Sequence, residues 1–215
     1  MKRTLAVLVL FLLVTSAWGE DDVFRYPLNS QTMESFTRTS ENLSVHPLIL
    51  GNFSQERFLS RFNRSLFSSG NFIIAAELGM LWETLEPFPS TMTLGRDYIV
   101  QSRPGGQRTV LSAQGNETFL SLAEVLSTVF SGHVQRLLDN FEVYFSGTPA
   151  AWEMGLIPKD RAIALFARRI IMKGDQVIRS ILINEQNGDS ISYTLSNHRH
   201  PHELTERENA HFFIP

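Results

Sequence analysis

Residues 168–196 read RRIIMKGDQVIRSILINEQNGDSISYTLS, and this stretch decides the fold. From residue 190 onward isoleucine, tyrosine and leucine alternate with serine and threonine, a period-two pattern that is typical of a half-buried β-strand. Gly174-Asp175 and Asn187-Gly188 interrupt the apolar runs and are short turn signals. The stretch therefore predicts three antiparallel strands joined by tight hairpins.

The same kind of pattern extends toward the N-terminus. Further strands are expected over 48–61, 67–76, 80–85, 91–94, 98–100, 109–113, 141–145 and 152–158, and residues 211–213 are expected to close the sheet. Apolar residues at three- and four-residue spacing predict helices over 29–43 and 116–141, the second divided at Gly132. The sequence thus predicts an α+β fold, with about ten strands in a single curved antiparallel sheet whose concave face is covered by helices.

Composition excludes several classes of protein. The chain has 215 residues, which fits one domain with a sizeable core, and a net charge of −3 with a pI near 6.1. Without a basic run, a nucleic-acid binder is excluded. The chain has no cysteine, which excludes a disulfide framework, a thiol nucleophile, a cysteine-ligated zinc ion and a lipidated N-terminal cysteine.

Residues 1–19 have the pattern of a secretory signal. Lys2 and Arg3 precede an apolar run, and Ala17-Trp18-Gly19 places small residues where a signal peptidase acts, so cleavage is expected after Gly19. Its loss lowers the net charge to −5 and leaves residues 20–215 as one soluble domain. A retained N-terminal anchor is the alternative. Export without cysteine favours the bacterial periplasm, and the four Asn-x-Ser/Thr sequences are then accidental.

Catalytic chemistry is poorly represented. The sequence holds no nucleophile elbow, P-loop, zinc-protease motif or dinucleotide fingerprint, so we expect a protein that is not an enzyme and needs no cofactor. The run His198-Arg199-His200-Pro201-His202 is the one cluster of metal-ligand residue types. Pro201 disturbs the strand and Arg199 repels a cation, so we interpret the run as a polar loop and expect no metal.

The predicted strands and the long helix carry many large apolar side chains. These side chains either line a lipid-binding cavity or fill the core. A curved sheet under a lid of helices can leave an apolar cavity between the two layers. The candidate lining residues are Phe53, Phe72, Ile74, Trp82, Phe88, Met92, Leu94 and Trp152 on strands, and Phe119, Leu122, Leu126, Val129 and Phe130 on the long helix, which is the candidate lid.

Several short motifs resemble one known family. Residues 51–56 (GNFSQE), 69–72 (SGNF), 79–83 (GMLWE) and 87–91 (PFPST) lie in the order seen in that family, and residues 152–159 (WEMGLIPK) look like its W-x-L-x-L-x-P-K strand. With Gly188-Asp189 and the alternation after it, the match covers roughly residues 48–195. On these motifs the chain resembles a divergent branch of the LolA-like periplasmic outer-membrane lipoprotein carriers.

The resemblance implies an architecture and a function. The family fold is an incomplete, half-open β-barrel covered by helices that act as a lid. The implied function is a soluble periplasmic carrier that binds the acyl chains of a lipoprotein or other lipid in an apolar cavity and shuttles it toward the outer membrane. The implied partners are an inner-membrane exporter as donor and an outer-membrane acceptor.

The chain departs from the family at the lid latch. Typical carriers have an arginine before the tryptophan of the third strand, whereas residues 76–82 (AELGMLW) have Glu77 and no arginine. This leaves the cargo open between lipoprotein, glycolipid and polyene lipid. Two other functions also stay open from the residues alone: a non-enzymatic envelope protein with a filled core that binds a partner or has a structural role, and a lipid hydrolase.

Overall fold

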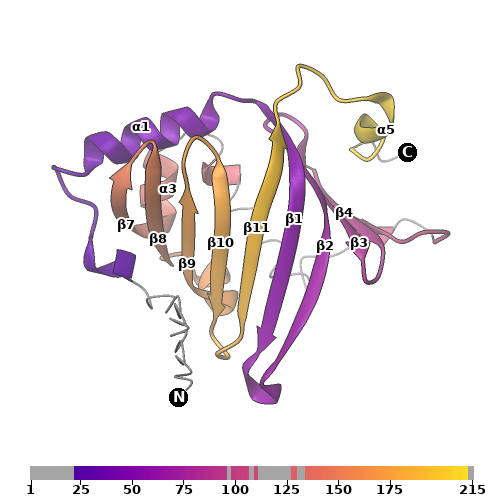
Figure 1. Cartoon of the computed structure of the whole chain (residues 1–215), viewed down its shortest axis with the longest axis horizontal. Coiled ribbons are helices and arrows are strands. Elements are labelled where there is room, and N and C mark those ends of the chain that lie inside the picture. Colours follow the sequence, from indigo (N-terminus) through magenta and orange to yellow (C-terminus); the bar gives the residue numbers. More distant parts are fainter. Residues whose placement is uncertain (1–21, 96–97, 107–108, 111–126, 130–133, 213–215) are drawn as a thin grey trace, which may run out of the picture.

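The computed structural model describes residues 22–95, 98–106, 109–110, 127–129 and 134–212. Within this part of the chain, eleven strands form one antiparallel sheet in the order β6-β5-β4-β3-β2-β1-β11-β10-β9-β8-β7 (Figure 1). The strands are β1 (Leu48–Leu59), β2 (Arg64–Ala75), β3 (Gly79–Glu86), β4 (Ser90–Leu94), β5 (Ile99–Ser102), β6 (Thr109–Val110), β7 (Phe141–Thr148), β8 (Ala151–Pro158), β9 (Ala167–Gly174), β10 (Ile178–Glu185) and β11 (Ser190–Arg199).

The order of the strands explains how the sheet is built. Every neighbour except one is the next strand along the chain. The exception is the pairing of β1 with β11, which places the first strand of the chain beside the last. Strands β6 and β7 lie at opposite edges of the sheet order and do not pair with each other. The sheet is therefore an open barrel, and the predicted α+β fold with a single antiparallel sheet is confirmed.

Short helices accompany the sheet. They are η1 (Asp22–Arg25), α1 (Met33–Ser44), η2 (Ser60–Phe62), α3 (Val134–Asn140), α4 (Arg161–Phe166) and α5 (Glu206–Asn209). Helices α1 and α3 pack on β7, and α4 packs on β8 and β9. The helix expected over 29–43 is confirmed as α1. Of the helix expected over 116–141, residues 127–129 and 134–140 are helical, Phe141 begins β7 instead, and residues 116–126 and 130–133 lie outside the described residues.

The two faces of the sheet differ in what covers them. We call the face that packs against α1 and α3 the inner face, and the opposite one the outer face. Phe36 of α1 and Leu137 of α3 belong to the main buried cluster on the inner face. A smaller cluster on the outer face combines Leu48, Leu50, Ile73, Ala75 and Leu81 with Phe212 from the C-terminal segment.

The expected closing strand over 211–213 is wrong in its described part. The Thr205 side chain and the Glu208 side chain form a reciprocal capping box that starts α5. The N–H groups of His211 and Phe212 then donate to Glu208 and Asn209, so the chain continues as a helical turn. Phe212 is buried on the outer face, where the Tyr98 hydroxyl donates to its carbonyl.

The described residues contain no helix that combines the length and the apolar character needed to cross a bilayer.

Candidate functional site

The inner face is a continuous apolar surface that the strand register assembles in rows. One row runs from Phe145 through Met154, Met172 and Ile181 to Tyr193, each residue directly opposite the next on five successive strands. Because side chains alternate across a strand, residues in register on neighbouring strands share a face. Nine of the eleven strands contribute side chains that are buried in this cluster or packed against it, and only β5 and β6 do not.

An aromatic group lies at the middle of this surface. The ring centroid of Trp82 lies 4.4 Å from Phe53, 5.8 Å from Phe72 and 5.2 Å from Tyr193. Each of the four side chains is at most 6% exposed. Offset and edge-to-face pairs at such distances add to the stabilisation from burial.

Two glycines make room for these rings. A Cβ at Gly70 would lie 1.8 Å from the backbone oxygen of Glu83 and 3.0 Å from the Phe53 ring, and a Cβ at Gly51 would lie 2.7 Å from the Phe72 ring. Gly70 on β2 lies directly opposite Phe53 on β1, and Gly51 on β1 lies directly opposite Phe72 on β2. The rings therefore lie flat across the adjacent strand, which only a residue without a side chain permits.

The structure places the predicted lining residues unevenly. Phe53, Phe72, Ile74, Trp82, Val129 and Trp152 are buried in the inner cluster, Leu94 packs against it, and Met92 is half-buried opposite Trp82. Phe88 is 81% exposed and lies apart from them. Phe119, Leu122, Leu126 and Phe130 lie outside the described residues.

A charged pair lies on the same face. Nη2 of Arg57 on β1 donates to Oε2 of Glu185 on β10 at 3.0 Å, and Glu185 is only 8% exposed. Among the described residues, Glu185 is the one charged residue that is buried. Burial raises the pKa of the nearby Tyr193 phenol well above its usual value, an effect that Arg57 opposes and Glu185 reinforces. The sequence analysis missed this pair because its members are 128 residues apart.

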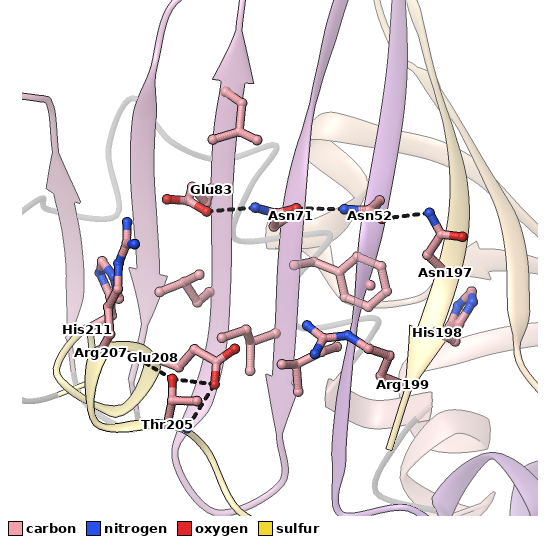
Figure 2. Close-up of a pocket in the computed structure, with 16 residues that line it drawn as sticks. Asn52, Asn71, Glu83, Asn197, His198, Arg199, Thr205, Arg207, Glu208 and His211 are labelled. Carbon is pink, nitrogen blue, oxygen red and sulfur yellow. Dashed lines mark hydrogen bonds between the residues drawn. The ribbon is translucent and has the colours of Figure 1, made fainter. Parts of the chain in front are cut away.

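The outer face carries a second candidate site, a pocket of about 660 Å³ between the sheet and the C-terminal segment. Figure 2 shows Glu83, Asn71, Asn52 and Asn197 in one row across β3, β2, β1 and β11. Nδ2 of Asn197 donates to Oδ1 of Asn52 at 2.8 Å, Nδ2 of Asn52 to Oδ1 of Asn71 at 2.6 Å, and Nδ2 of Asn71 to Oε2 of Glu83 at 2.9 Å. We call these four residues the amide row.

A β-bulge brings Asn197 into that row. Asn52 pairs with Ser196 and Leu50 with Arg199, so β11 has one residue more than β1 over this interval. Asn197 has φ of +51°, the left-handed conformation that asparagine tolerates better than most residues. Strict alternation would place Asn197 and Arg199 on the inner face with Leu195, and the bulge instead turns both toward the pocket (Figure 2).

The histidines of the predicted cluster lie at and beyond the C-terminal end of β11 but do not converge. The rings of His200 and His46 stack with centroids 3.8 Å apart, while His198 meets Phe72 edge-on at 5.8 Å. Burial lowers the pKa of both His198 and His200; Arg179 lowers that of His198 further, and His46 that of His200. Among the described residues, no group of three or more His, Asp or Glu side chains could hold a metal ion.

Comparison with known proteins returns structural matches only. No family model and no curated protein matches the chain. Similar solved structures include LolA superfamily protein NE2245 from Nitrosomonas europaea (8% identity, 81% of this chain and 95% of that one, TM-score 0.48) and a DUF1329 family protein from Desulfovibrio piger (9%, 85% and 96%, 0.49). The MucA/MucB complex of Pseudomonas aeruginosa is another (12%, 86% and 62%, 0.46). At such identities and TM-scores these matches say nothing about a shared site or a shared function.

Proposed function

We propose that this protein is a soluble carrier that holds the acyl chains of a lipoprotein or another lipid against its inner face and moves them through the periplasm toward the outer membrane. The observation that carries this proposal is the apolar inner face, to which nine strands contribute and in which the buried charge of Glu185 is paired with Arg57. The ordered LolA-like motifs in the sequence support the same function.

The hydrophobic effect explains why such a carrier is needed. A sixteen-carbon acyl chain has about fifteen methylenes, and at roughly 0.8 kcal/mol each its exposure to water costs about 12 kcal/mol. Contact with an apolar face removes most of that cost. Met80, Met154 and Met172 on the inner face are unbranched and adaptable, which suits binding that does not depend on one chain shape.

The tip of the β1–β2 hairpin supplies a surface for contact with membranes. Phe62, Leu66 and Phe67 are 65%, 55% and 67% exposed, and the exposed side chains of Arg61 and Arg64 flank them. The hairpin extends beyond the neighbouring β10–β11 turn (Figure 1). Leu66 and Phe67 are adjacent on one strand and so face opposite sides, and no single packed layer covers both. A lipid surface into which the tip inserts would cover both, and its anionic headgroups would attract the arginines.

In this scheme the carrier receives its load from an inner-membrane exporter and passes it to an outer-membrane acceptor. A non-enzymatic protein with a filled core is the second candidate, and the close packing of Trp82 against Phe53, Phe72 and Tyr193 favours it. The two candidates differ in whether the inner face opens to a guest.

A fluorescent fatty acid tests the proposal, with two variants of adjacent residues. Met92 faces inward opposite Trp82, whereas Thr91, paired with Glu83, faces outward; both are half-buried on β4. Met92→Glu places a carboxylate on the inner face and is expected to weaken probe binding at least tenfold, while Thr91→Glu leaves it within about twofold.

The result that contradicts the proposal is equally definite. If the wild-type protein shows no saturable increase in probe fluorescence, or if both variants bind as the wild type does, acyl chains do not bind on the inner face. Circular dichroism of each variant checks that the sheet is intact.

A further inference from the structure

The pocket on the outer face is separated from the inner face by the sheet itself, so what it binds is a question independent of the carrier function. Its lining includes Leu50, Ile73 and Leu81 of the outer-face cluster together with the four residues of the amide row. A volume of about 660 Å³ lies within the range of roughly 300–1000 Å³ that is typical of small-molecule sites.

The amide row has a fixed direction. The Glu83 carboxylate can only accept, so Asn71 turns its Nδ2 toward Glu83 and its oxygen toward Asn52, and Asn52 and Asn197 follow in the same sense. Each amide uses one N–H or one lone pair for each neighbour and keeps a second N–H and a second lone pair. The row therefore offers alternating donors and acceptors, spaced about 4.8 Å apart like the strands.

Two arginines also line this pocket. Arg199 extends from β11, and Arg207 belongs to α5, which the capping box of Thr205 and Glu208 holds in place (Figure 2). Both guanidinium groups are exposed, and within the described residues neither forms an ion pair. The Glu208 carboxylate of the pocket already accepts hydrogen bonds from the Thr205 N–H and hydroxyl, at 2.8 and 2.7 Å.

The anchoring of the C-terminal segment makes this a formed site. Phe212 and Leu204 pack on the outer-face cluster, and Tyr98 donates to the Phe212 carbonyl. Helix α5, which carries Arg207, is thus held on the outer face by packing and by a cap.

These features together select one kind of ligand. An arginine binds a carboxylate or phosphate through a planar fork of donors. A bare anion satisfies the arginines but not the amide row, which presents acceptors as well as donors and ends in a carboxylate. Hydroxyl groups both donate and accept, and the C–H face of a sugar ring packs on aliphatic side chains. We propose that the outer pocket binds an acidic sugar, with its anionic group at Arg199, its hydroxyls along the amide row, and Arg207 donating to it from the other side of the pocket.

Titration of the full chain with glucose 6-phosphate, glucuronate, glucose and inorganic phosphate tests this proposal, followed by NMR of the side-chain amide signals. We expect saturable shifts with at least one of the two acidic sugars, and which of them binds shows whether the pocket prefers a phosphate or a carboxylate. Glucose and inorganic phosphate are each expected to bind at least tenfold more weakly. Arg199→Ala and Arg207→Ala are each expected to weaken binding about tenfold, as loss of a charge-assisted hydrogen bond does. Arg61→Ala, at the distant hairpin tip, is the matched control.

Glu83→Gln provides a second test that keeps the side-chain shape. It removes the fixed direction of the amide row and is expected to weaken the acidic sugar several-fold without changing the affinity for inorganic phosphate. The proposal is overturned if neither acidic sugar gives a saturable shift, if inorganic phosphate binds as tightly as the sugars, or if both arginine variants bind like the wild type. None of these outcomes depends on whether the inner face binds a fatty acid.

Discussion

Replacement of Trp82 by alanine measures how tightly the middle of the inner face is packed. The side chain is 6% exposed, and a tryptophan of this kind buries roughly 150–250 Å². At about 25 cal/mol per Å² that burial stabilises the fold by about 4–6 kcal/mol, and residual compactness of the unfolded chain reduces the figure to about 3–5 kcal/mol. The same substitution removes the ring contacts of Trp82 with Phe53, Phe72 and Tyr193.

Equilibrium unfolding in urea, followed by far-ultraviolet circular dichroism, gives the free energy directly. We expect Trp82→Ala to lower the free energy of unfolding by about 3–5 kcal/mol and Trp82→Phe, which keeps a ring, to lower it by much less. A loss below about 1 kcal/mol for Trp82→Ala would refute the reasoning, because it would mean that the indole borders open space and not packed neighbours.

Three further perturbations test separate parts of the structure. Gly70→Ala forces a Cβ against the backbone of the next strand and should cost about 2–4 kcal/mol of stability, whereas Gly106→Ala in a loop should cost much less; equal losses in thermal unfolding would contradict the close approach. Glu185→Gln leaves Arg57, which is 31% exposed, without its anionic partner and should lower the free energy of unfolding by about 1–3 kcal/mol. The double variant Glu185→Gln with Arg57→Met should recover part of this loss. Burial and a stacked imidazole hold the pKa of His200 below its unfolded value of about 6.5, so the folded state binds fewer protons and stability should fall as the pH drops from 7.5 to 5.5, with a smaller fall in His200→Gln.

Local alternation was enough to predict most of the sheet. Residues 168–196 form three strands with the expected turns, and Gly188 has the positive φ of 88° that a tight hairpin requires. The inward positions of Phe53, Phe72 and Trp82 follow from the same alternation once the register is known. Helix α1 follows from three- and four-residue spacing.

The remaining features depend on contacts that no local pattern encodes. The ion pair of Arg57 with Glu185 joins strands from opposite halves of the chain. Asn197 enters the amide row only because a bulge shifts β11 by one residue against β1, and a bulge leaves no periodic signal. Residues 211–213 suit a strand by their aromatic side chains, but the capping box at Thr205 starts a helix whose last turn continues through Phe212.

The proposed function requires that the inner face binds acyl chains. Native mass spectrometry of the protein purified from the cells that produce it tests that claim most directly. We expect a population heavier than the bare chain, which loses its added mass on organic extraction and releases a lipid with at least one long acyl chain. A single species at the mass of the bare chain, which also fails to take up a fluorescent fatty acid, would contradict it.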